Sequence, residues 1–367
     1  MLKVICDRGA LLNALNLVGH VVVQRTPKPV LGCVKVTAQT DALILAATDA
    51  ETAIRITSRR VEVQQPGEAL IPAEKLSQIV RESVDPTLTL EVEEDAAHIR
   101  AQDSHFKIFV HNAEDFPPLP ESDGKADFEI SAAKLHKLIA QTLFATARES
   151  SRYAINGVLF ERDGKKLVVV ATDGRRLALA KGDCKQAKGD NRSAIVPTKA
   201  MATMQHMFQD PDQTVGVRIA DNQIIFTSDD AMLASNLVEG NFPPYQDVVP
   251  RDGDRKATLG TDVLASGVRR AALLTNEESK GVRLAFKPEG LTLSSRAPEM
   301  GEAQINLEMA DYSGEPIDIG FNPHFIVDAL KIVDMEQVTI ELKAANKPGL
   351  LRCGPDFLYV IMPVNLQ

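Results

Sequence analysis

The chain of 367 residues is 44% hydrophobic, enough for two or three globular domains with ordinary cores. Its 41 basic and 50 acidic residues give a formal net charge of −9, which argues against indiscriminate binding to polyanions. Any contact with DNA therefore has to come from a local basic surface. No apolar run reaches membrane-spanning length, and the N-terminus lacks the apolar core of a signal peptide, so we expect a cytoplasmic protein with no membrane contact.

Cysteine and histidine are placed in a way that argues against metal and disulfide chemistry. The four cysteines lie far apart with no Cys-x-x-Cys pair, and the seven histidines are scattered. We expect small buried thiols in a reducing compartment, and no disulfide, metal or cofactor.

Three segments of the chain share one layout at an offset of roughly 125 residues, and each begins with an amphipathic helix. The first helix is predicted from Asp7 to about Gln24, the second begins after a likely cap at Ser131, and the third begins at Thr261. Their apolar faces are formed by residues three and four apart: Leu11, Leu15, Val18 and Val22; Leu135, Leu138, Ile139 and Leu143; Leu264, Val268 and Ala272.

An extended stretch and a hairpin follow each helix. The extended stretches are Val30–Thr37, Ile155–Glu161 and Val282–Lys287, and the hairpins are Leu43–Ile56, Leu167–Ala180 and a weaker Leu291–Leu307. In the second hairpin a buried strand runs into a tight turn at Asp173-Gly174, and Ala47-Thr48-Asp49 repeats that phrase 124 residues earlier. Because both aspartates lie in a repeated turn, we predict that they accept backbone hydrogen bonds and do not form a catalytic pair.

A second helix and closing strands complete each segment. Pro72, Pro197 and Asn322 mark the predicted starts of the second helices, and each lies 125 residues after the one before it. The first two segments end in Asp115-Phe116-Pro117-Pro118 and Asn241-Phe242-Pro243-Pro244-Tyr245. We predict domains at 1–125, 126–253 and 254–367, each with two helices and about eight strands.

The charges of the three segments are −5, 0 and −4, so none is a basic domain. Many cations nevertheless fall on the polar faces of the predicted helices. Lys134, Lys137, Gln141 and Arg148 form a single stripe at helical spacing, and Arg269 and Arg270 lie on another helix. A solvated helix face explains any one of these helices, whereas all six together could present a shared surface to a polyanion.

Catalytic motifs are missing from the sequence. There is no P-loop, no Gly-x-Gly-x-x-Gly after a strand, no His-Glu-x-x-His and no nucleophile elbow. An enzyme built on repeated α+β units and a sequence-specific DNA-binding protein remain the alternatives.

Several phrases resemble the bacterial DNA polymerase sliding clamp family, the β subunit of the replicase. They are Ala171-Thr172-Asp173-Gly174-Arg175-Arg176-Leu177-Ala178, Arg152-Tyr153-x-x-Asn156-Gly157, Phe242-Pro243-x-Tyr245 and Tyr359-Val360-Ile361-Met362-Pro363. The resemblance implies an α+β fold: three tandem DNA-clamp-type domains, each with two inner helices and outer antiparallel sheets, forming half of a ring. It also implies a non-enzymatic processivity factor, a homodimer that encircles duplex DNA without sequence preference and tethers polymerases, the clamp loader and repair proteins through short linear peptides.

Helix dimensions are compatible with such a ring. Twelve helices about 10 Å wide, packed side by side, leave a hole of about 28 Å, whereas six leave about 9 Å. A duplex roughly 20 Å wide passes only the larger hole, so two chains are needed, joined by a head-to-tail interface that closes.

The resemblance also suggests site residues. The partner-peptide cleft would comprise Ile155, Thr172, Gly174, Arg175, Arg176, Leu177, Pro243, Val248, Asn322, Phe325, Val360, Ile361, Met362, Pro363, Val364 and Leu366. DNA contacts would come from the family-matched Arg25, Arg152, Tyr153 and Lys199, to which helix phase adds Lys134, Lys137, Arg148 and Arg269. The dimer interface would use Phe106, Ile108, Leu273 and Leu274, with Glu299 and Glu302 facing Lys75, Arg100 or Lys107.

Some positions depart from the family pattern. Glu149 and Ala154 replace polar and aromatic residues near the DNA-contact phrase, which predicts a weaker contact there. Asp247 stands where a basic residue is frequent, Ser279 where an aromatic one is common, and Asn365 is unusual near the end of the chain. These three predict an altered peptide preference.

Overall fold

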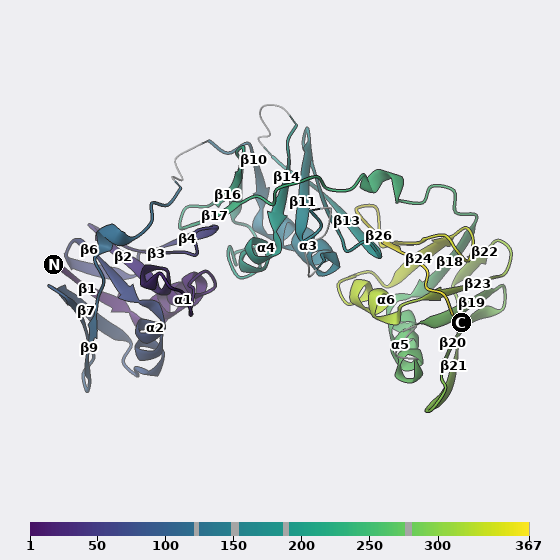
Figure 1. The fold of residues 1–367 in the computed structure, drawn as a ribbon, viewed down its shortest axis with the longest axis horizontal. Coiled ribbons are helices and arrows are strands. Elements are labelled where there is room, and N and C mark those ends of the chain that lie inside the picture. Colours follow the sequence, from purple (N-terminus) through teal and green to yellow (C-terminus); the bar gives the residue numbers. More distant parts are fainter. Residues whose placement is uncertain (121–124, 148–153, 186–190, 276–280, 367) are drawn as a thin grey trace. The chain divides into compact units, whose positions relative to one another are not determined.

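The computed structural model describes residues 1–120, 125–147, 154–185, 191–275 and 281–366 (Figure 1). The chain divides into two compact units. Unit 1 comprises Met1–Ala133, Cys184–Asp190 and Lys199–Leu237, and unit 2 comprises Lys134–Asp183, Asn191–Thr198 and Val238–Gln367. Among the described residues, no helix is both long enough and apolar enough to cross a membrane.

Six α-helices are present in the described residues, two in each sequence segment. They are α1 (Arg8–Gly19), α2 (Ala73–Glu82), α3 (Ala132–Thr142), α4 (Thr198–Met204), α5 (Thr261–Ala271) and α6 (Pro323–Leu330). Asp7 caps α1 by accepting a hydrogen bond from the Ala10 N–H at 2.8 Å, and Asn322 caps α6 in the same way. The predicted helix starts are therefore confirmed.

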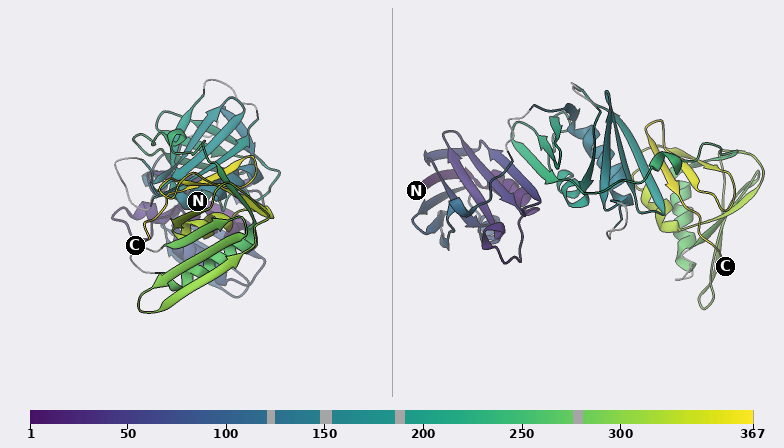
Figure 2. Two further views of the ribbon diagram at one scale, coloured as in Figure 1. Left: turned by 90° about the vertical axis from the view of Figure 1, so that its right-hand side faces the viewer. Right: turned by 45° about the horizontal axis from the view of Figure 1, so that its top comes forward.

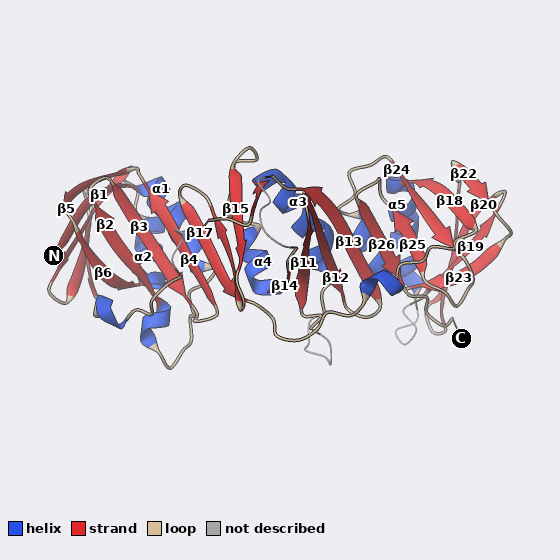
Figure 3. Ribbon diagram, turned by 90° about the horizontal axis from the view of Figure 1, so that it is seen from above, coloured by secondary structure: helices blue, strands red, loops and turns tan. Residues whose placement is uncertain are grey.

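Unit 1 contains two antiparallel sheets, which Figure 3 shows as red strands with the helices in blue. A five-stranded sheet has the order β5 (Val61–Gln65), β1 (Leu2–Asp7), β7 (Thr87–Glu93), β8 (Ala96–Arg100), β9 (His105–Phe109). An eight-stranded sheet has the order β10 (Phe128–Ser131), β15 (Thr214–Ile219), β16 (Gln223–Thr227), β17 (Ala231–Asn236), β4 (Thr52–Ser58), β3 (Ala42–Thr48), β2 (Cys33–Gln39), β6 (Gly67–Pro72). Helix α1 packs on β3, β4 and α2.

Unit 2 repeats this plan with a nine-stranded and a four-stranded sheet. The larger has the order β14 (Ser193–Pro197), β11 (Gly157–Asp163), β12 (Lys166–Thr172), β13 (Arg176–Asp183), β26 (Phe357–Ile361), β25 (Gly349–Arg352), β24 (Gln337–Leu342), β18 (Arg255–Gly260), β22 (Asp311–Ser313). The smaller has the order β21 (Gly301–Leu307), β20 (Gly290–Ala297), β19 (Val282–Lys287), β23 (Ile317–Phe321). Helix α5 lies along the β20–β21 hairpin and packs on it (Figure 2).

The two predicted turns have the same hydrogen-bond network. Asp49 Oδ1 accepts from the backbone N–H groups of Glu51 and Thr52, and Asp173 Oδ1 accepts from those of Arg175 and Arg176. The third turn position has a positive φ in both, 79° at Ala50 and 84° at Gly174. The prediction that these aspartates hold a backbone turn is therefore confirmed.

Three expectations about the helices need correction. Each first helix is preceded by a strand (β1, β10 or β18), whereas the predicted layout began each segment with the helix. The first helix ends at Gly19, before the expected Gln24. The predicted stripe of polar and basic residues on the second helix is wrong, because Gln141 is only 7% exposed and α3 ends at Thr142. Arg148, the last residue of that stripe, lies outside the described residues.

Strand pairing joins neighbouring sequence segments in the same way twice. In unit 1, β4 of the first segment pairs with β17 of the second, with Ala53 opposite Ala234. In unit 2, β13 of the second segment pairs with β26 of the third, with Leu177 opposite Val360. In both cases the second strand of the repeated hairpin meets the last strand of the following segment.

Replacing Asp49 with alanine should destabilise unit 1. The side chain is largely buried, accepts two backbone hydrogen bonds and pairs with Lys199, so we expect a loss of about 1–3 kcal/mol. Thermal unfolding followed by circular dichroism measures the loss. Asp41→Ala, at an exposed turn, is the control and should shift Tm little. Equal shifts in both variants would contradict a special role for Asp49.

Candidate peptide-binding cleft

An apolar cleft of about 170 Å³ opens in unit 2, where the turn after β12 meets the end of β26. It is lined by Ile155, Thr172, Gly174, Arg176, Leu177, Pro243, Tyr245, Val248, Val360 and Met362. Nine of these ten residues belong to the predicted cleft. The pairing of β13 with β26 therefore brings together residues that are distant in the sequence.

The floor of the cleft is continuous with a hydrophobic cluster, and its rim is exposed. Leu177 and Val360 face each other across the ladder and are almost fully buried. Val248 and Met362 remain 40% and 38% exposed. An apolar floor with a flexible methionine at its edge suits apolar side chains of varied shape.

Arg176 forms the charged wall of the cleft. Its guanidinium donates to Asp173, Asp328 and the Phe144 carbonyl at 2.8–3.0 Å. It also lies over the rings of Phe144 and Phe325, at 5.4 and 4.6 Å from their centroids. Burial alone would lower the pKa of Arg176, but Tyr359, Asp328 and Asp173 outweigh burial and hold that pKa above its ordinary value. The charge is therefore permanent and already partnered.

Tyr245 lines the cleft although the predicted site omitted it. It lies in the short helix η4 (Tyr245–Asp247), and its hydroxyl donates to the Glu161 carboxylate. Burial, followed by this hydrogen bond, raises the pKa of Tyr245 above its ordinary value. The signal was available, since Phe242-Pro243-x-Tyr245 belongs to the motifs that suggested the family. Ala154, noted as a departure near the DNA-contact phrase, lies in the same hydrophobic cluster.

The other seven predicted cleft residues lie outside the lining of the cavity. Arg175 is exposed in the turn, Asn322 caps α6, and Phe325 stands behind Arg176. Ile361 is buried at the end of β26. Pro363, Val364 and Leu366 continue into the C-terminal tail, where the Val364 N–H donates to the Gly320 carbonyl at 2.9 Å.

The predicted DNA contacts lie on different elements, and some of them pair with carboxylates. Arg25 is exposed in the loop after α1, Lys134 is exposed on α3, and Arg269 is exposed in the last turn of α5. Lys199 pairs with Asp49. Lys137 Nζ donates a hydrogen bond to Asp334 Oδ2 at 2.8 Å, and this bond lowers the pKa of the Asp334 carboxyl.

Arg148, Arg152 and Tyr153 lie outside the described residues, as do the departures Glu149 and Ser279.

The predicted interface residues lie at two sheet edges. Among the residues that the structure describes, β9, which carries Phe106 and Ile108, pairs only with β8, and β21, which carries Glu302, pairs only with β20. Leu273, which is 76% exposed, and Leu274 lie in the short helix η5 (Ala272–Leu274) after α5. Glu299 lies in the turn between β20 and β21 and is exposed.

Metal-binding clusters are absent from the part of the chain that the structure describes: no three His, Cys, Asp or Glu residues are placed to share a metal ion. The four cysteines are buried as free thiols.

Comparison with known families gives a match over nearly the whole chain. The models of the DNA polymerase III β subunit match residues 2–120 (N-terminal domain), 129–244 (central domain) and 246–365 (C-terminal domain). A β sliding clamp from Pseudomonas aeruginosa is 34% identical, covering 98% of this chain and 99% of the relative. One from Chlamydia pneumoniae is 31% identical over the full length of both.

Solved structures agree with the sequence matches. A sliding clamp (DNA polymerase III subunit β) from Pseudomonas aeruginosa bound to griselimycin aligns with a TM-score of 0.94 at 33% identity, over all of both chains. A DNA polymerase sliding clamp from Bacillus subtilis aligns with a TM-score of 0.94 at 26% identity, again over all of both chains. The chain belongs to the β-subunit family of bacterial DNA polymerase III, the β sliding clamps, and is a polymerase processivity factor with no enzymatic activity of its own.

Proposed function

We propose that two copies of this chain close head to tail into a cytoplasmic ring that encircles duplex DNA and slides along it. Polymerases, the clamp loader and repair proteins dock through short apolar peptides. The observation that carries the proposal is the recurring strand junction, β4 with β17 and β13 with β26. The chain joins its segments twice in one way, and within the described residues β21, the second strand of the third hairpin, lies at the edge of its sheet. That edge is suited to a third junction with another copy.

Three domains follow from the same repeat. We place them at 1–125, 126–253 and 254–367, each with two helices and its own copy of the hairpin. The three family models, which match residues 2–120, 129–244 and 246–365, support a threefold division. The compact units divide the chain differently because strand pairing at the junctions merges the sheets of neighbouring segments.

The repeat also gives a register for the dimer interface. Ala53 lies opposite Thr48 in the first hairpin, and Leu177 lies opposite Thr172 in the second. Glu302 lies opposite Arg296 in the third hairpin and therefore occupies the position of Ala53 and Leu177. Lys107, Ala234 and Val360 each lie on the last strand of a segment. Following the paired residues back through the sheet leads from all three to the same position relative to the start of the first helix, so Lys107 occupies the position of Ala234 and Val360.

Pairing β21 with β9 of a second copy in this register sets Glu302 opposite Lys107 of the partner subunit. The next pair is Ala303 with Phe106 of the partner subunit. Leu273 and Leu274 add apolar area beside β21, since η5 packs on that strand. Ile108 follows Lys107 directly in the sequence, and Glu299 lies three residues before Glu302.

Contacts with DNA are expected to be few and water-mediated, because strong or base-specific contacts would stop sliding. Arg25 and Arg269 carry exposed charges and are the stronger candidates. Lys134 is exposed as well, but its charge acts on Asp183 and helps to lower the pKa of that carboxyl. Lys199 and Lys137 are engaged with carboxylates, so phosphate has to compete for them. Arg148, Arg152 and Tyr153 stay in the proposal by resemblance alone.

The cleft takes the apolar side chains of a partner peptide on Leu177, Val360 and Met362. The remaining predicted residues, Arg175, Asn322, Phe325, Ile361, Pro363, Val364 and Leu366, continue from it along the turn, α6 and the tail. Asp247 follows Tyr245 and Gln246 in η4 and places a negative charge next to Val248 on the rim. Together with Asn365 it is the candidate for altered peptide preference.

Charge reversal tests the dimer register. Light scattering should give a mass near twice 39.9 kDa for the native chain. Lys107→Glu or Glu302→Lys alone puts like charges opposite each other and should raise the dimer Kd severalfold. The double variant should recover the native Kd, and Lys28→Glu, in an exposed loop, should leave it unchanged.

A monomeric native chain at micromolar concentration would contradict the ring. Additive losses in the double variant would contradict the register alone.

Topological retention tests encirclement. Protein assembled on a nicked circular plasmid should stay bound during gel filtration and should be lost when the plasmid is cut once, because the ring slides off the ends. The measurement is the amount of protein that elutes with DNA before and after cutting. Equal retention on both forms would indicate ordinary binding.

Truncating the rim of the cleft tests docking. A labelled pentapeptide with two leucines and a phenylalanine, called here the core peptide, should bind the native chain. Met362→Ala should weaken it about tenfold through lost apolar contact. Met335→Ala, which removes a methionine of similar exposure elsewhere, is the control in a fluorescence anisotropy titration. Dimer mass should be unchanged in both. Unaltered binding to Met362→Ala would exclude this cleft as the site.

A further inference from the structure

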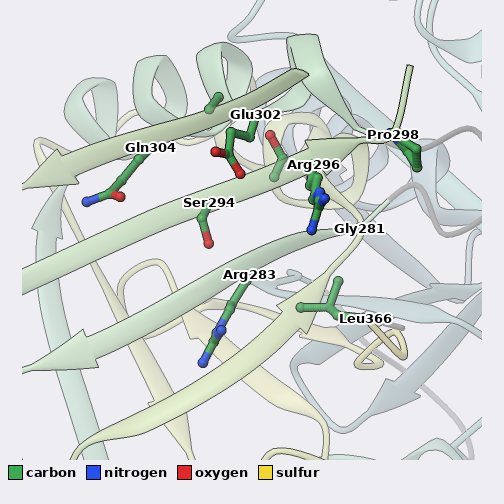
Figure 4. A pocket seen from close by; sticks show the side chains of 10 residues that line it. Gly281, Arg283, Ser294, Arg296, Pro298, Glu302, Gln304 and Leu366 are labelled. Atoms are coloured by element: carbon green, nitrogen blue, oxygen red, sulfur yellow. The ribbon is translucent and has the colours of Figure 1, made fainter. Parts of the chain in front are cut away.

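A second cavity, of about 720 Å³, lies in unit 2 on the face of the four-stranded sheet that points away from α5. Figure 4 shows Arg283, Arg296 and Glu302 on neighbouring strands of this sheet, with Leu366 at the edge. The rest of the lining is Gly281, Ser294, Ser295, Pro298, Ala303 and Gln304. Unlike the first cavity, this one is mostly polar.

The second cavity is the counterpart of the apolar cleft in the third segment. Arg296 occupies the position of Thr172 and Glu302 that of Leu177, as the hairpin ladders require. The location is therefore equivalent, but charged side chains replace a threonine and a leucine. A ligand for this cavity has to be polar.

The C-terminal tail connects the two cavities. Met362 lines the cleft and Leu366 lines the second cavity, so three residues lie between them and the two positions are at most about 14 Å of extended chain apart. Gly320 allows the tail to lie this close, because a Cβ there would be 2.6 Å from Leu366 Cγ and 2.7 Å from the Val364 carbonyl oxygen. A linear segment bound in the cleft can reach the second cavity with four or five further residues.

The charge of the lining selects the sign of that ligand. Two guanidinium groups, Arg283 and Arg296, line the cavity with one carboxylate, Glu302. Arg283 pairs with Asp318, and both side chains are about half exposed. In the proposed dimer register, Lys107 of the partner subunit lies opposite Glu302 and adds a cation. With Asp318 counted, the charges of this chain cancel, so the net positive charge of the cavity comes from that partner lysine and favours carboxylates.

We propose that this cavity is a second docking site, which binds an acidic flank of the same partner peptide that places its apolar residues in the cleft. The proposal rests on the proposed docking function and deepens it. Arg283 and Arg296 would pair with the carboxylates of the flank, and Ser294 and Gln304 would hydrogen-bond its backbone. Partners with an acidic flank would then outcompete partners that carry the apolar core alone.

Extended peptides test this with the full-length protein. The core peptide is lengthened at either end by Gly-Ser-Gly followed by two glutamates, two glutamines or two lysines, and each Kd is measured by anisotropy. Because the cavity lies to one side of the cleft, the glutamate extension should tighten binding about threefold to tenfold at one end only, relative to the glutamine extension. The lysine extension should not tighten it.

Arg283→Gln with Arg296→Gln should abolish the gain and leave the Kd of the core peptide unchanged, which also verifies folding. Lys287→Gln, on the same strand but outside the cavity, should retain the gain. No gain at either end, or equal loss in the Lys287 variant, would overturn the second site. Failure of the core peptide to bind the native chain would instead overturn the cleft itself.

Discussion

Backbone hydrogen bonding between sequence segments is the interaction on which the rest of this structure depends. Two ladders, β4 with β17 and β13 with β26, make continuous sheets out of strands from neighbouring segments. Each ladder satisfies donors and acceptors that would otherwise be left open at a sheet edge. The apolar cleft is a direct consequence, since the β13–β26 pair forms its floor and the turn that precedes β13 forms one of its walls.

The turn itself explains why the junction is well defined. Asp173 closes the turn through backbone N–H groups and, with its second oxygen, orients Arg176. Arg176 then contacts Asp328 on α6, so one side chain ties the hairpin of the second segment to a helix of the third. Burying a guanidinium is costly unless its donors are satisfied, and here two carboxylates and a carbonyl satisfy them. The same residue thereby holds the junction and forms the charged wall of the cleft.

Equivalent positions have diverged between the junctions in a way that separates their roles. Ala53 and Ala234 pack against Leu119 in unit 1, Leu177 and Val360 form the apolar floor of the cleft in unit 2, and Glu302 occupies the matching place on the edge strand β21. Small residues suit a closed core, large apolar residues suit reversible docking, and a charge at a free edge discourages indiscriminate pairing. One backbone plan therefore supports three different surfaces.

The sequence by itself determined the threefold layout, the helix starts, the hairpin turns and the absence of catalytic motifs, because these depend on local periodicity, caps and turn residues. It also placed nine of the ten cleft residues through family resemblance, and missed Tyr245. Only the tertiary structure decided that Gln141 is buried, that Lys199 and Lys137 are ion-paired, and that Leu366 belongs to a second cavity. These outcomes depend on which distant strand or carboxylate lies opposite a residue, and no local pattern in the chain records that.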